Sequence, residues 1–310
     1  MTTPPAIRIA VVGCGAMGAV YASRLARAGH DVVVVDSWAE HVAAMDSYGL
    51  TVTGPDGTHT AFVRAFTRPP EEVVDLVIIA VKAADAGSAA ARLAGLMGPE
   101  TTVLTIQNGL GAADAVAEHV DPDRLSVGIA KGFGASLTRP GQVHHNAMRE
   151  LRFGAHTGGG KPDVEALAAV WRGAGFDAEA VDEIAAMQWT KLICNAAYSA
   201  PCAISGTTVG EVLRSSTLGP ISLSAAREAY AIARTNRVGI DLDPEALVID
   251  FAAGMPDAKP SVLLDLEAGR RSEIEFINGA VPREAAKVGL TAPINEALTR
   301  LVREVEGSSS

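Results

Sequence analysis

The sequence has few cysteines, an excess of acidic over basic residues, and no long apolar run. Its three cysteines, Cys14, Cys194 and Cys202, are too few and too scattered for a disulfide framework, and they lack zinc-ligand spacing. Lysine and arginine number 26 against 36 acidic residues, and the net charge of −10 repels phosphate backbones. We therefore expect no metal site, no nucleic-acid partner, and a reducing compartment, the cytoplasm.

Membrane and export signals are not found either. No stretch of about 18 uncharged apolar residues occurs, so no transmembrane helix is predicted. No basic segment precedes the first apolar run, Ile7 to Val12, so no signal peptide is expected. The composition, 48% hydrophobic and 20% charged, is instead typical of a folded globular chain and excludes intrinsic disorder.

Short apolar runs alternate with helical segments in the first part of the 310-residue chain. This alternation predicts an α/β fold with a mainly parallel, Rossmann-type sheet. Leu50 to Thr67 alternates around Gly54-Pro55-Asp56-Gly57, a pattern typical of a hairpin. The other expected strands are Ile7 to Val12, Val32 to Val35, Leu76 to Val81, Thr101 to Ile106, Leu125 to Ala130, Gln142 to Asn146 and Glu150 to Gly154; the expected helices are Ala19 to Ala28, Ala39 to Ser47, Gly87 to Met97 and Gly109 to His119.

After Val181 the pattern is almost wholly helical, which predicts an all-helical C-terminal domain. We therefore divide the chain into a dinucleotide-binding domain, residues 6–181, and a helical substrate domain, residues 182–306. The expected helices are Ile184 to Tyr198, Thr207 to Arg214, Leu218 to Val238, Pro244 to Ala252, Val262 to Glu267, Glu273 to Val288 and Ile294 to Val305. The pair His144-His145 lies in an expected strand, where neighbours point to opposite faces; we expect both at the surface and neither to bind metal.

A glycine-rich turn follows the first strand. Gly13 to Gly18 fits G-x-G-x-x-G and opens a helix. Gly13 permits the tight turn, Gly15 lets a pyrophosphate approach the backbone, and Gly18 lets the helix pack on the sheet. The alternative is a strand–helix turn without a ligand. We expect Gly13, Gly15, Ala16, Met17 and Gly18 to bind a dinucleotide at the helix N-terminus.

Asp36 ends the second strand, 18 residues after Gly18. A carboxylate there accepts hydrogen bonds from the adenosine ribose and repels a 2′-phosphate. No lysine or arginine lies between Val32 and Val63, so Asp36 favours NAD(H) over NADP(H). In the alternative interpretation Asp36, or Ser37 beside it, caps the following helix.

Polar residues also follow two later strands. Lys82 comes after Leu76 to Val81, and Gln107-Asn108-Gly109 comes after Thr101 to Ile106. Ligands of open α/β sheets bind outside these carboxyl ends, so both places are candidates for the nicotinamide site. The alternatives are a solvated lysine and an ordinary Asn-Gly turn.

The helical half contains a second group of candidates. Lys191, Asn195 and Ser199 are spaced four apart and share one helix face, where an ammonium and polar groups suit reduction of a carbonyl. The alternative is a polar stripe on a surface helix. Further along, Ser261 is either functional or a helix N-cap, and Glu273 is either functional or a favourable acid at a helix start behind Ser272.

Together these stretches resemble the ketopantoate reductase family. The similar segments follow the family's order over positions 13 to 279: Gly13 to Gly18, Val81-Lys82-Ala83, Gln107-Asn108-Gly109, Lys191-Leu192 with Asn195, Ala200 to Gly206, and Ser261 through Gly269-Arg270-Arg271 and Glu273-Ile274 to Ile277-Asn278-Gly279.

The resemblance implies an NAD(P)H-dependent reductase of a small 2-oxo acid, in the first place 2-dehydropantoate (ketopantoate) to D-pantoate in pantothenate biosynthesis. It implies that Lys191 is the general acid, that Glu273 supports it, and that Asn195 and Ser261 bind substrate. Asn108 and Lys82 then line the nicotinamide end, with Asn108 also near the substrate. A partly buried lysine beside a positive ring is expected to have a lowered pKa.

Two departures from the family pattern bear on substrate and cofactor. The family's second asparagine is Ser199 here, and its Asn-Pro pair is Ser199-Ala200; serine offers fewer hydrogen bonds. Many members use NADPH, whereas Asp36 favours NADH. One alternative is therefore an NAD-dependent D-2-hydroxyacid dehydrogenase for a branched or aromatic acid. A non-catalytic dinucleotide sensor and, more distantly, a 3-hydroxyacid dehydrogenase are the others. Monomer and homodimer both stay open.

Overall fold

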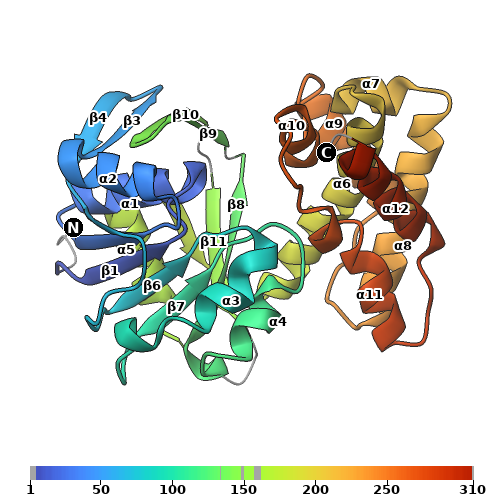
Figure 1. Cartoon of the computed structure of the whole chain (residues 1–310). Helices are drawn as coiled ribbons and strands as arrows, with labels where there is room; N and C mark the ends of the chain where they lie inside the picture. The colour runs from blue at the N-terminus through green and yellow to red at the C-terminus, as the bar shows by residue number, and fades with distance from the viewer. Residues whose placement is uncertain (1–4, 133, 148–149, 157–161, 309–310) are drawn as a thin grey trace. The chain divides into compact units, whose positions relative to one another are not determined.

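A computed structural model describes residues 5–132, 134–147, 150–156 and 162–308. The chain divides into two compact units (Figure 1). The sheet unit comprises Met1–Gln107 and Ala112–Ile184, and the helical unit comprises Asn108–Gly111 and Ala185–Ser310. The division falls after Ile184, close to the boundary near Val181 that the sequence predicts. A short segment from the first half of the chain, Asn108–Gly111, packs with the helical unit.

The described residues of the sheet unit form an eight-stranded sheet in the order β12-β11-β8-β7-β6-β1-β2-β5. Neighbouring strands in it are parallel except β8 and β11, which are antiparallel. The predicted α/β fold is therefore confirmed. The strands are β1 (Arg8–Val12), β2 (Asp31–Val35), β5 (Arg64–Phe66), β6 (Leu76–Ile79), β7 (Thr102–Thr105), β8 (Leu125–Lys131), β11 (Glu150–Ala155) and β12 (Asp177–Ala180).

The helices of the sheet unit are mostly short. They are α1 (Ala16–Arg27), α2 (Ala39–Tyr48), α3 (Ala86–Ala90), α4 (Ala112–Ala117) and α5 (Val164–Gly173), with 3₁₀ turns η1 (Ala83–Asp85), η2 (Ala94–Leu96) and η3 (Pro122–Arg124). The single helix expected over Gly87 to Met97 is wrong, because α3 ends at Ala90 and η2 follows. Leu93 and Leu96 are both buried, and a 3₁₀ turn places residues three apart on the same side.

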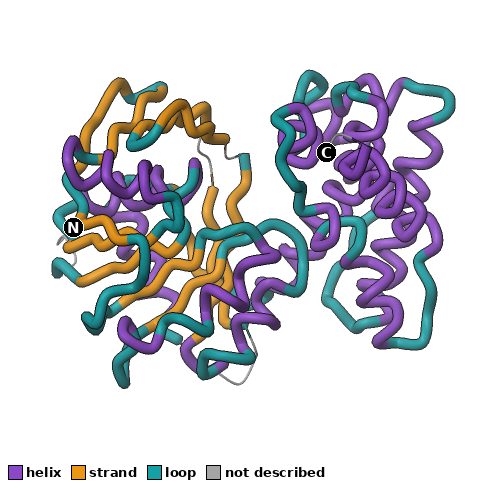
Figure 2. The backbone as a smooth tube through the Cα atoms, in the orientation of Figure 1, coloured by secondary structure: helices purple, strands orange, loops and turns teal. Residues whose placement is uncertain are grey.

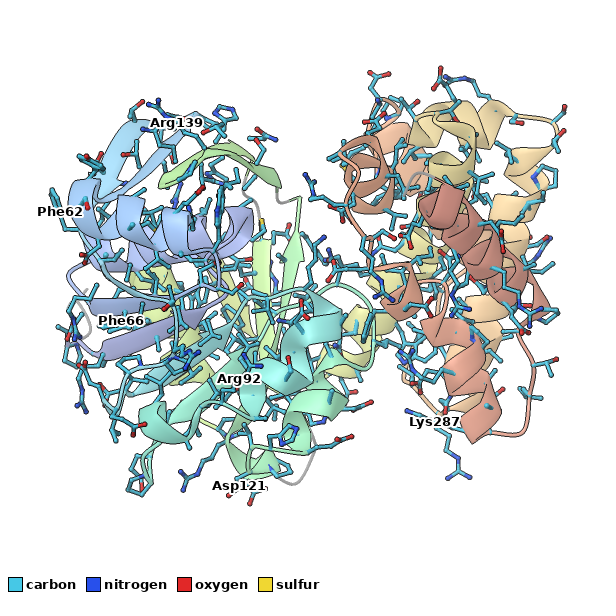
Figure 3. All side chains as sticks on the ribbon, in the orientation of Figure 1. Phe62, Phe66, Arg92, Asp121, Arg139 and Lys287 are labelled. Carbon is cyan, nitrogen blue, oxygen red and sulfur yellow. The ribbon has the colours of Figure 1, made fainter. Side chains whose placement is uncertain are left out.

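A second sheet, order β4-β3-β10-β9, was not expected from the sequence. The hairpin predicted over Leu50 to Thr67 is confirmed, as β3 (Leu50–Gly54) and β4 (Gly57–Ala61). β10 (Gln142–Ala147) pairs with β3, and β9 (Gly134–Arg139) pairs with β10. At its rim Phe62 and Arg139 point outward (Figure 3).

The expectation that both histidines of β10 lie at the surface is wrong for one of them. His144 is exposed, and its Nδ1 lies 2.9 Å from the Thr53 hydroxyl. His145 is only 4% exposed. The alternation of side chains along the strand explains the difference, because β10 has one face covered by α1.

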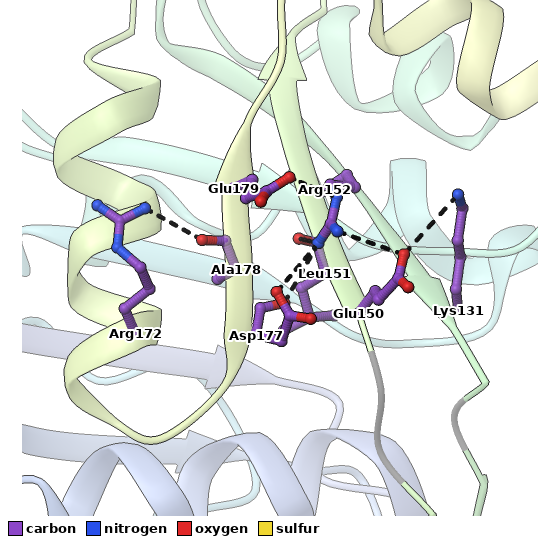
Figure 4. A network of polar contacts seen from close by, with 8 residues as sticks. All are labelled: Lys131, Glu150, Leu151, Arg152, Arg172, Asp177, Ala178 and Glu179. Carbon is purple, nitrogen blue, oxygen red and sulfur yellow. Dashed lines mark hydrogen bonds and ion pairs between the residues drawn. The ribbon is translucent and has the colours of Figure 1, made fainter.

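A network of charged side chains lies at the edge of the large sheet formed by β11 and β12 (Figure 4). Arg152 on β11 is only 12% exposed at its side chain and lies 3.0 to 3.5 Å from three carboxylates, those of Glu150, Asp177 and Glu179. Lys131 on β8 approaches Glu150 at 4.0 Å. Two of these acids alternate along β12, so the edge strand presents charge and is protected from pairing with another chain.

The helical unit consists almost wholly of helix (Figure 2). Its elements are α6 (Ile184–Ser205), α7 (Val209–Arg214), α8 (Leu218–Thr235), α9 (Pro244–Gly254), α10 (Ser261–Glu267), the 3₁₀ turn η4 (Ile274–Phe276), α11 (Ala280–Lys287) and α12 (Pro293–Ser308). Alanines of α6 and α8, such as Ala197 and Ala225, are fully buried, and their small side chains suit close helix packing. No described helix is long and apolar enough to cross a membrane.

The single helix predicted from Glu273 to Val288 is also wrong. The chain forms η4, turns at Ile277 with φ −105° and ψ −96°, and begins α11 at Ala280. A Cβ on Gly279 would lie 2.8 Å from the Glu275 carbonyl oxygen, so the corner requires glycine. Asn278 at the same corner is fully buried and forms side-chain hydrogen bonds to other helices, which a continuous surface helix does not offer.

Candidate functional site

The glycine-rich turn joins β1 to α1 in the sheet unit. Gly13 has a φ of +91°, and a Cβ there would lie 2.5 Å from the Val81 backbone nitrogen. A Cβ on Gly18 would lie 2.0 Å from the Gly13 carbonyl oxygen. Both glycines are therefore required by the chain's own packing, with or without a ligand.

Gly15 differs from these two glycines. Its φ of −63° suits any residue, and a Cβ there would meet nothing within 4 Å among the described residues. It is the N-cap of α1, and no described side chain caps that helix end. The backbone N–H groups of Ala16 and Met17 lie in this first turn. Open space beside uncapped donors at a helix N-terminus fits a pyrophosphate, so the residues present suit a dinucleotide.

Asp36 fixes the turn from the end of β2. Its two carboxylate oxygens accept hydrogen bonds from the backbone N–H groups of Cys14 and Trp38, each at 2.9 Å. The N-cap of α2 is Trp38, so neither Asp36 nor Ser37 occupies that capping position. A carboxylate oxygen accepts more than one hydrogen bond, so Asp36 retains acceptor capacity for ribose hydroxyls.

Buried groups behind the turn hold it from the other side. His41 is 1% exposed; its Nδ1 accepts from the Gly141 N–H at 2.9 Å, so Nε2 carries the proton and donates to the Cys14 carbonyl at 2.8 Å. His41 thereby joins the turn to the second sheet, a role that no sequence pattern indicated. Burial, and secondarily the charge of Asp36, raises the pKa of the Cys14 thiol well above its usual range, which keeps it protonated.

The two polar residues at the ends of β6 and β7 serve different purposes. The Gln107 side-chain amide donates to the carbonyls of Ile79 at 2.7 Å and Val81 at 3.2 Å, and its oxygen accepts from the Thr105 hydroxyl. Both of its N–H groups are thus engaged within the sheet unit, so the side chain fixes the loop geometry. Lys82 is exposed and is the N-cap residue of η1.

In the helical unit, Lys191 Nζ donates to Asn108 Oδ1 at 2.7 Å. Asn108 is brought there by its own segment: the Leu110 N–H donates to the Phe276 carbonyl at 2.9 Å. Gly109 has a φ of +82°, and a Cβ there would lie 1.8 Å from that same carbonyl oxygen. Asn108-Gly109 is therefore no ordinary exposed turn, because it docks on η4 and presents an amide to the lysine.

The other candidates lie on α6 and on the segments around η4. Asn195 is half-buried and Ser199 is only 3% exposed, so the face they share with Lys191 is not a solvated surface stripe. Glu273 is the N-cap residue of η4 and is 9% exposed. A carboxylate so deeply buried is uncommon and needs polar partners.

The capping alternatives meet different outcomes. Ser261 is exposed and is the first residue of α10, whose N-cap is Pro260, so Ser261 is not an N-cap. The Ser272 hydroxyl does accept from the Ile274 N–H at 3.3 Å, as a capping serine would. The long helix whose dipole Glu273 was thought to suit does not form, because η4 is a single turn.

Comparison with known proteins gives consistent matches. The model of the family "Ketopantoate reductase PanE/ApbA" matches residues 9–158, and that of its C-terminal domain matches residues 183–306. A 2-dehydropantoate 2-reductase from Archaeoglobus fulgidus is 31% identical, over 96% of this chain and 98% of its own length. One from Halobacterium salinarum is 29% identical, over 96% and 98%.

Solved structures agree with these matches. A PanE/ApbA family ketopantoate reductase from Ralstonia eutropha superimposes with a TM-score of 0.88 at 30% identity, covering 97% of this chain and 99% of the other. A ternary structure of D-mandelate dehydrogenase with NADH and anilino(oxo)acetate superimposes with a TM-score of 0.89 at 26% identity, with the same coverage.

Gly15 and Gly18 are predicted to respond differently to alanine. Gly15→Ala leaves the melting temperature nearly unchanged but raises the Kd for NADH about tenfold or more, because the methyl group occupies pyrophosphate space. Gly18→Ala lowers the stability by about 1–3 kcal/mol through the clash with the Gly13 carbonyl. Thermal unfolding without ligand and NADH fluorescence titration measure the two effects. Equal losses of stability in both variants would contradict the distinction.

Asp36→Asn is predicted to weaken NADH binding and reduce discrimination against NADPH. Loss of a charge-assisted hydrogen bond of about 1.5–3 kcal/mol corresponds to roughly a ten- to hundredfold higher Kd. Titration of both cofactors measures the change. Asp31→Asn at the other end of β2, where the carboxylate pairs with Arg64, is the matched control and should leave both affinities unchanged. An unchanged NADH affinity in Asp36→Asn would contradict the prediction that the Asp36 carboxylate binds the adenosine ribose.

Proposed function

Because the chain belongs to the ketopantoate reductase family, we propose that it reduces ketopantoate (2-dehydropantoate) to D-pantoate with NADH. The chain is an oxidoreductase that acts on CH–OH groups with a nicotinamide dinucleotide. The observation that carries the proposal is the hydrogen bond of 2.7 Å from Lys191 Nζ to Asn108 Oδ1. Lys191 lies on the same face of α6 as Asn195 and Ser199.

Lys191 is the proposed general acid. A nicotinamide dinucleotide held at the glycine-rich turn of Gly13, Gly15 and Gly18 would supply the hydride for reduction of the carbonyl carbon of the 2-oxo acid. The Lys191 ammonium donates a hydrogen bond to the carbonyl oxygen, stabilises the negative charge that develops there, and transfers a proton to it. Asn108 accepts one of the three ammonium hydrogens and thereby orients the group. An ammonium group already oriented by this hydrogen bond loses little conformational entropy when substrate binds.

The remaining site residues are proposed to bind and orient the substrate. Asn195, Ser199 and Ser261 supply neutral hydrogen-bonding groups for the carboxylate and hydroxyl of the 2-oxo acid. Glu273 is proposed to support Lys191, since a buried carboxylate stabilises a nearby ammonium. Lys82 is proposed to lie at the nicotinamide end of the cofactor.

NADH is proposed over NADPH on the ground of charge. Asp36 places a carboxylate at the end of β2, and its two oxygens are already fixed by backbone donors. A 2′-phosphate there would meet a negative charge with no lysine or arginine between Val32 and Val63 to compensate.

A second candidate function is an NAD-dependent D-2-hydroxyacid dehydrogenase for a bulkier 2-oxo acid. Ser199 favours it, because serine is shorter than the asparagine usual at this place and is 3% exposed on the inner face of α6. The similar D-mandelate dehydrogenase, whose structure holds NADH and anilino(oxo)acetate, is consistent with this candidate.

The first experiment is an initial-rate assay of NADH and NADPH oxidation with ketopantoate and a panel of branched and aromatic 2-oxo acids. We expect turnover of ketopantoate with NADH, and a loss of about 10²–10⁴-fold in kcat for Lys191→Ala. Lys287→Ala is the matched control, since the Lys287 side chain, labelled in Figure 3, is 53% exposed and pairs with Glu284 on the same helix, α11. Reduction of no 2-oxo acid by the wild-type protein would reject the proposal in favour of a dinucleotide sensor.

Ser199→Asn distinguishes the two candidate substrates. If ketopantoate is bound through its hydroxyl at this place, the added amide raises kcat/KM for ketopantoate relative to an aromatic 2-oxo acid by about tenfold. Competition assays on the same enzyme preparation give this ratio directly. A wild-type enzyme that already prefers the aromatic acid, and loses that preference in Ser199→Asn, would establish the second candidate.

A further inference from the structure

A proline inside α6 leaves the helix short of one internal hydrogen bond. Pro201 has no N–H, so the Ala197 carbonyl, four residues earlier, lacks its helical donor. The Ser222 hydroxyl of α8 donates to that carbonyl at 2.7 Å. The preceding carbonyl, that of Ala196, accepts from the Asn278 side-chain amide at 2.8 Å. Two side chains from different elements therefore hold α6 at its proline.

Asn278 is fully buried at the corner between η4 and α11. Its other amide hydrogen goes to Asn295 Oδ1 at 2.9 Å, so both of its donors are engaged. Its own Oδ1 has no hydrogen-bond partner in the part of the chain that the structure describes. A buried polar atom without a partner costs free energy, so the stabilising contribution of Asn278 lies in the two bonds that it donates.

The network continues from Asn295 into the rest of the helical unit. Asn295 donates through its side chain to the Ala225 carbonyl at 3.1 Å and to Glu228 Oε2 at 2.7 Å. Glu228 also accepts from the backbone N–H groups of Ile294 and Asn295, at the start of α12. The orientation of Asn278 is therefore fixed through α8 and α12.

Asn278 thus connects the two elements that carry the proposed chemistry. Ala196 follows Asn195 directly and lies on α6 between Lys191 and Ser199. On the other side, η4 is closed by the Phe276 N–H to the Glu273 carbonyl at 2.9 Å and by the Gly279 N–H to the Ile274 carbonyl at 3.0 Å. The Phe276 carbonyl in turn holds the Leu110 N–H, and with it the segment of Asn108.

We propose that Asn278 is a positioning residue, which sets the spacing of α6 against η4 and thereby aligns Asn108 with Lys191. The inference rests on the proposed function for its kinetic consequence, but the alignment itself is a property of the helical unit. Asn278 acts through the Ala196 carbonyl on one side and through the corner after η4 on the other.

Asn278→Asp is the test variant, with Ser222→Ala as its matched control. The aspartate has nearly the same shape but loses both N–H donors and faces two acceptor oxygens. Ser222 is also fully buried and also bonds a carbonyl of α6 at Pro201, but it comes from α8 and has no bond to η4. Both variants remove buried hydrogen bonds next to the same proline, so a merely structural role predicts that each loses kcat in proportion to its loss of melting temperature.

We expect Asn278→Asp to lower kcat about ten- to hundredfold, since a small misplacement of catalytic groups has effects of that size. The Kd for NADH should stay within about twofold, because the glycine-rich turn lies in the sheet unit. Ser222→Ala should lower the melting temperature but leave kcat unchanged. If Asn278→Asp does not fold, Asn278→Ser, which retains one donor, takes its place in all measurements. Loss of kcat in both variants in proportion to their loss of melting temperature would overturn the proposal.

Hydrogen exchange followed by mass spectrometry gives a readout independent of turnover. In Asn278→Asp, exchange should accelerate in residues 185–205 and also in residues 108–111, where the Leu110 N–H reports the contact with η4. In Ser222→Ala only the α6 and α8 segments should exchange faster. Unchanged exchange at residues 108–111 in Asn278→Asp would overturn the positioning role. Should the wild-type protein reduce no 2-oxo acid, the proposed function fails, and this measurement alone decides the inference.

Discussion

The hydrogen bond between Lys191 and Asn108 joins parts of the chain 83 residues apart, and the architecture of the helical unit serves to hold it. Asn108 lies at the end of a strand of the sheet unit, but Gly109 and Leu110 pack against the Phe276 carbonyl, so Asn108 belongs with the helices. In the proposed function, this fixed amide oxygen orients the ammonium so that it presents its proton to the substrate carbonyl in a defined direction.

Different contacts fix the candidate site residues in the two units. In the sheet unit, the turn after β1 leaves open space at Gly15 beside the N–H donors at the start of α1, and the phosphates of the proposed cofactor would fit there. Asp36 and His41 fix this turn through backbone groups. In the helical unit, α6 presents polar side chains from a core rich in alanine. The buried Ser222 hydroxyl replaces the hydrogen bond that Pro201 removes, and the Asn278 amide bonds the preceding carbonyl, that of Ala196.

Much of the fold and the position of most candidate residues were predictable from local pattern. Short apolar strands alternating with helices predicted the parallel sheet, and the spacing of four residues placed Lys191, Asn195 and Ser199 on one helix face. The second sheet was not predicted, in part because the half-exposed strand β9 has no clear alternation of apolar and polar residues. Its pairing with β10 therefore could not be inferred from its own sequence. The prediction of one helix over Glu273 to Val288 was wrong because helix propensity depends on neighbouring residues alone. It does not include the buried hydrogen bonds that Asn278 forms with residues distant in the sequence.

The sequence by itself determined most strands of the large sheet and where the glycine-rich turn and the lysine helix lie, since these depend on neighbours along the chain. Only the tertiary structure decided that Asn108 contacts Lys191 and that the Gln107 amide donates to the carbonyls of Ile79 and Val81. It also decided that His145 is buried while His144 is exposed. These outcomes depend on groups distant in sequence, whose hydrogen bonds and burial arise only when the strands and helices pack together.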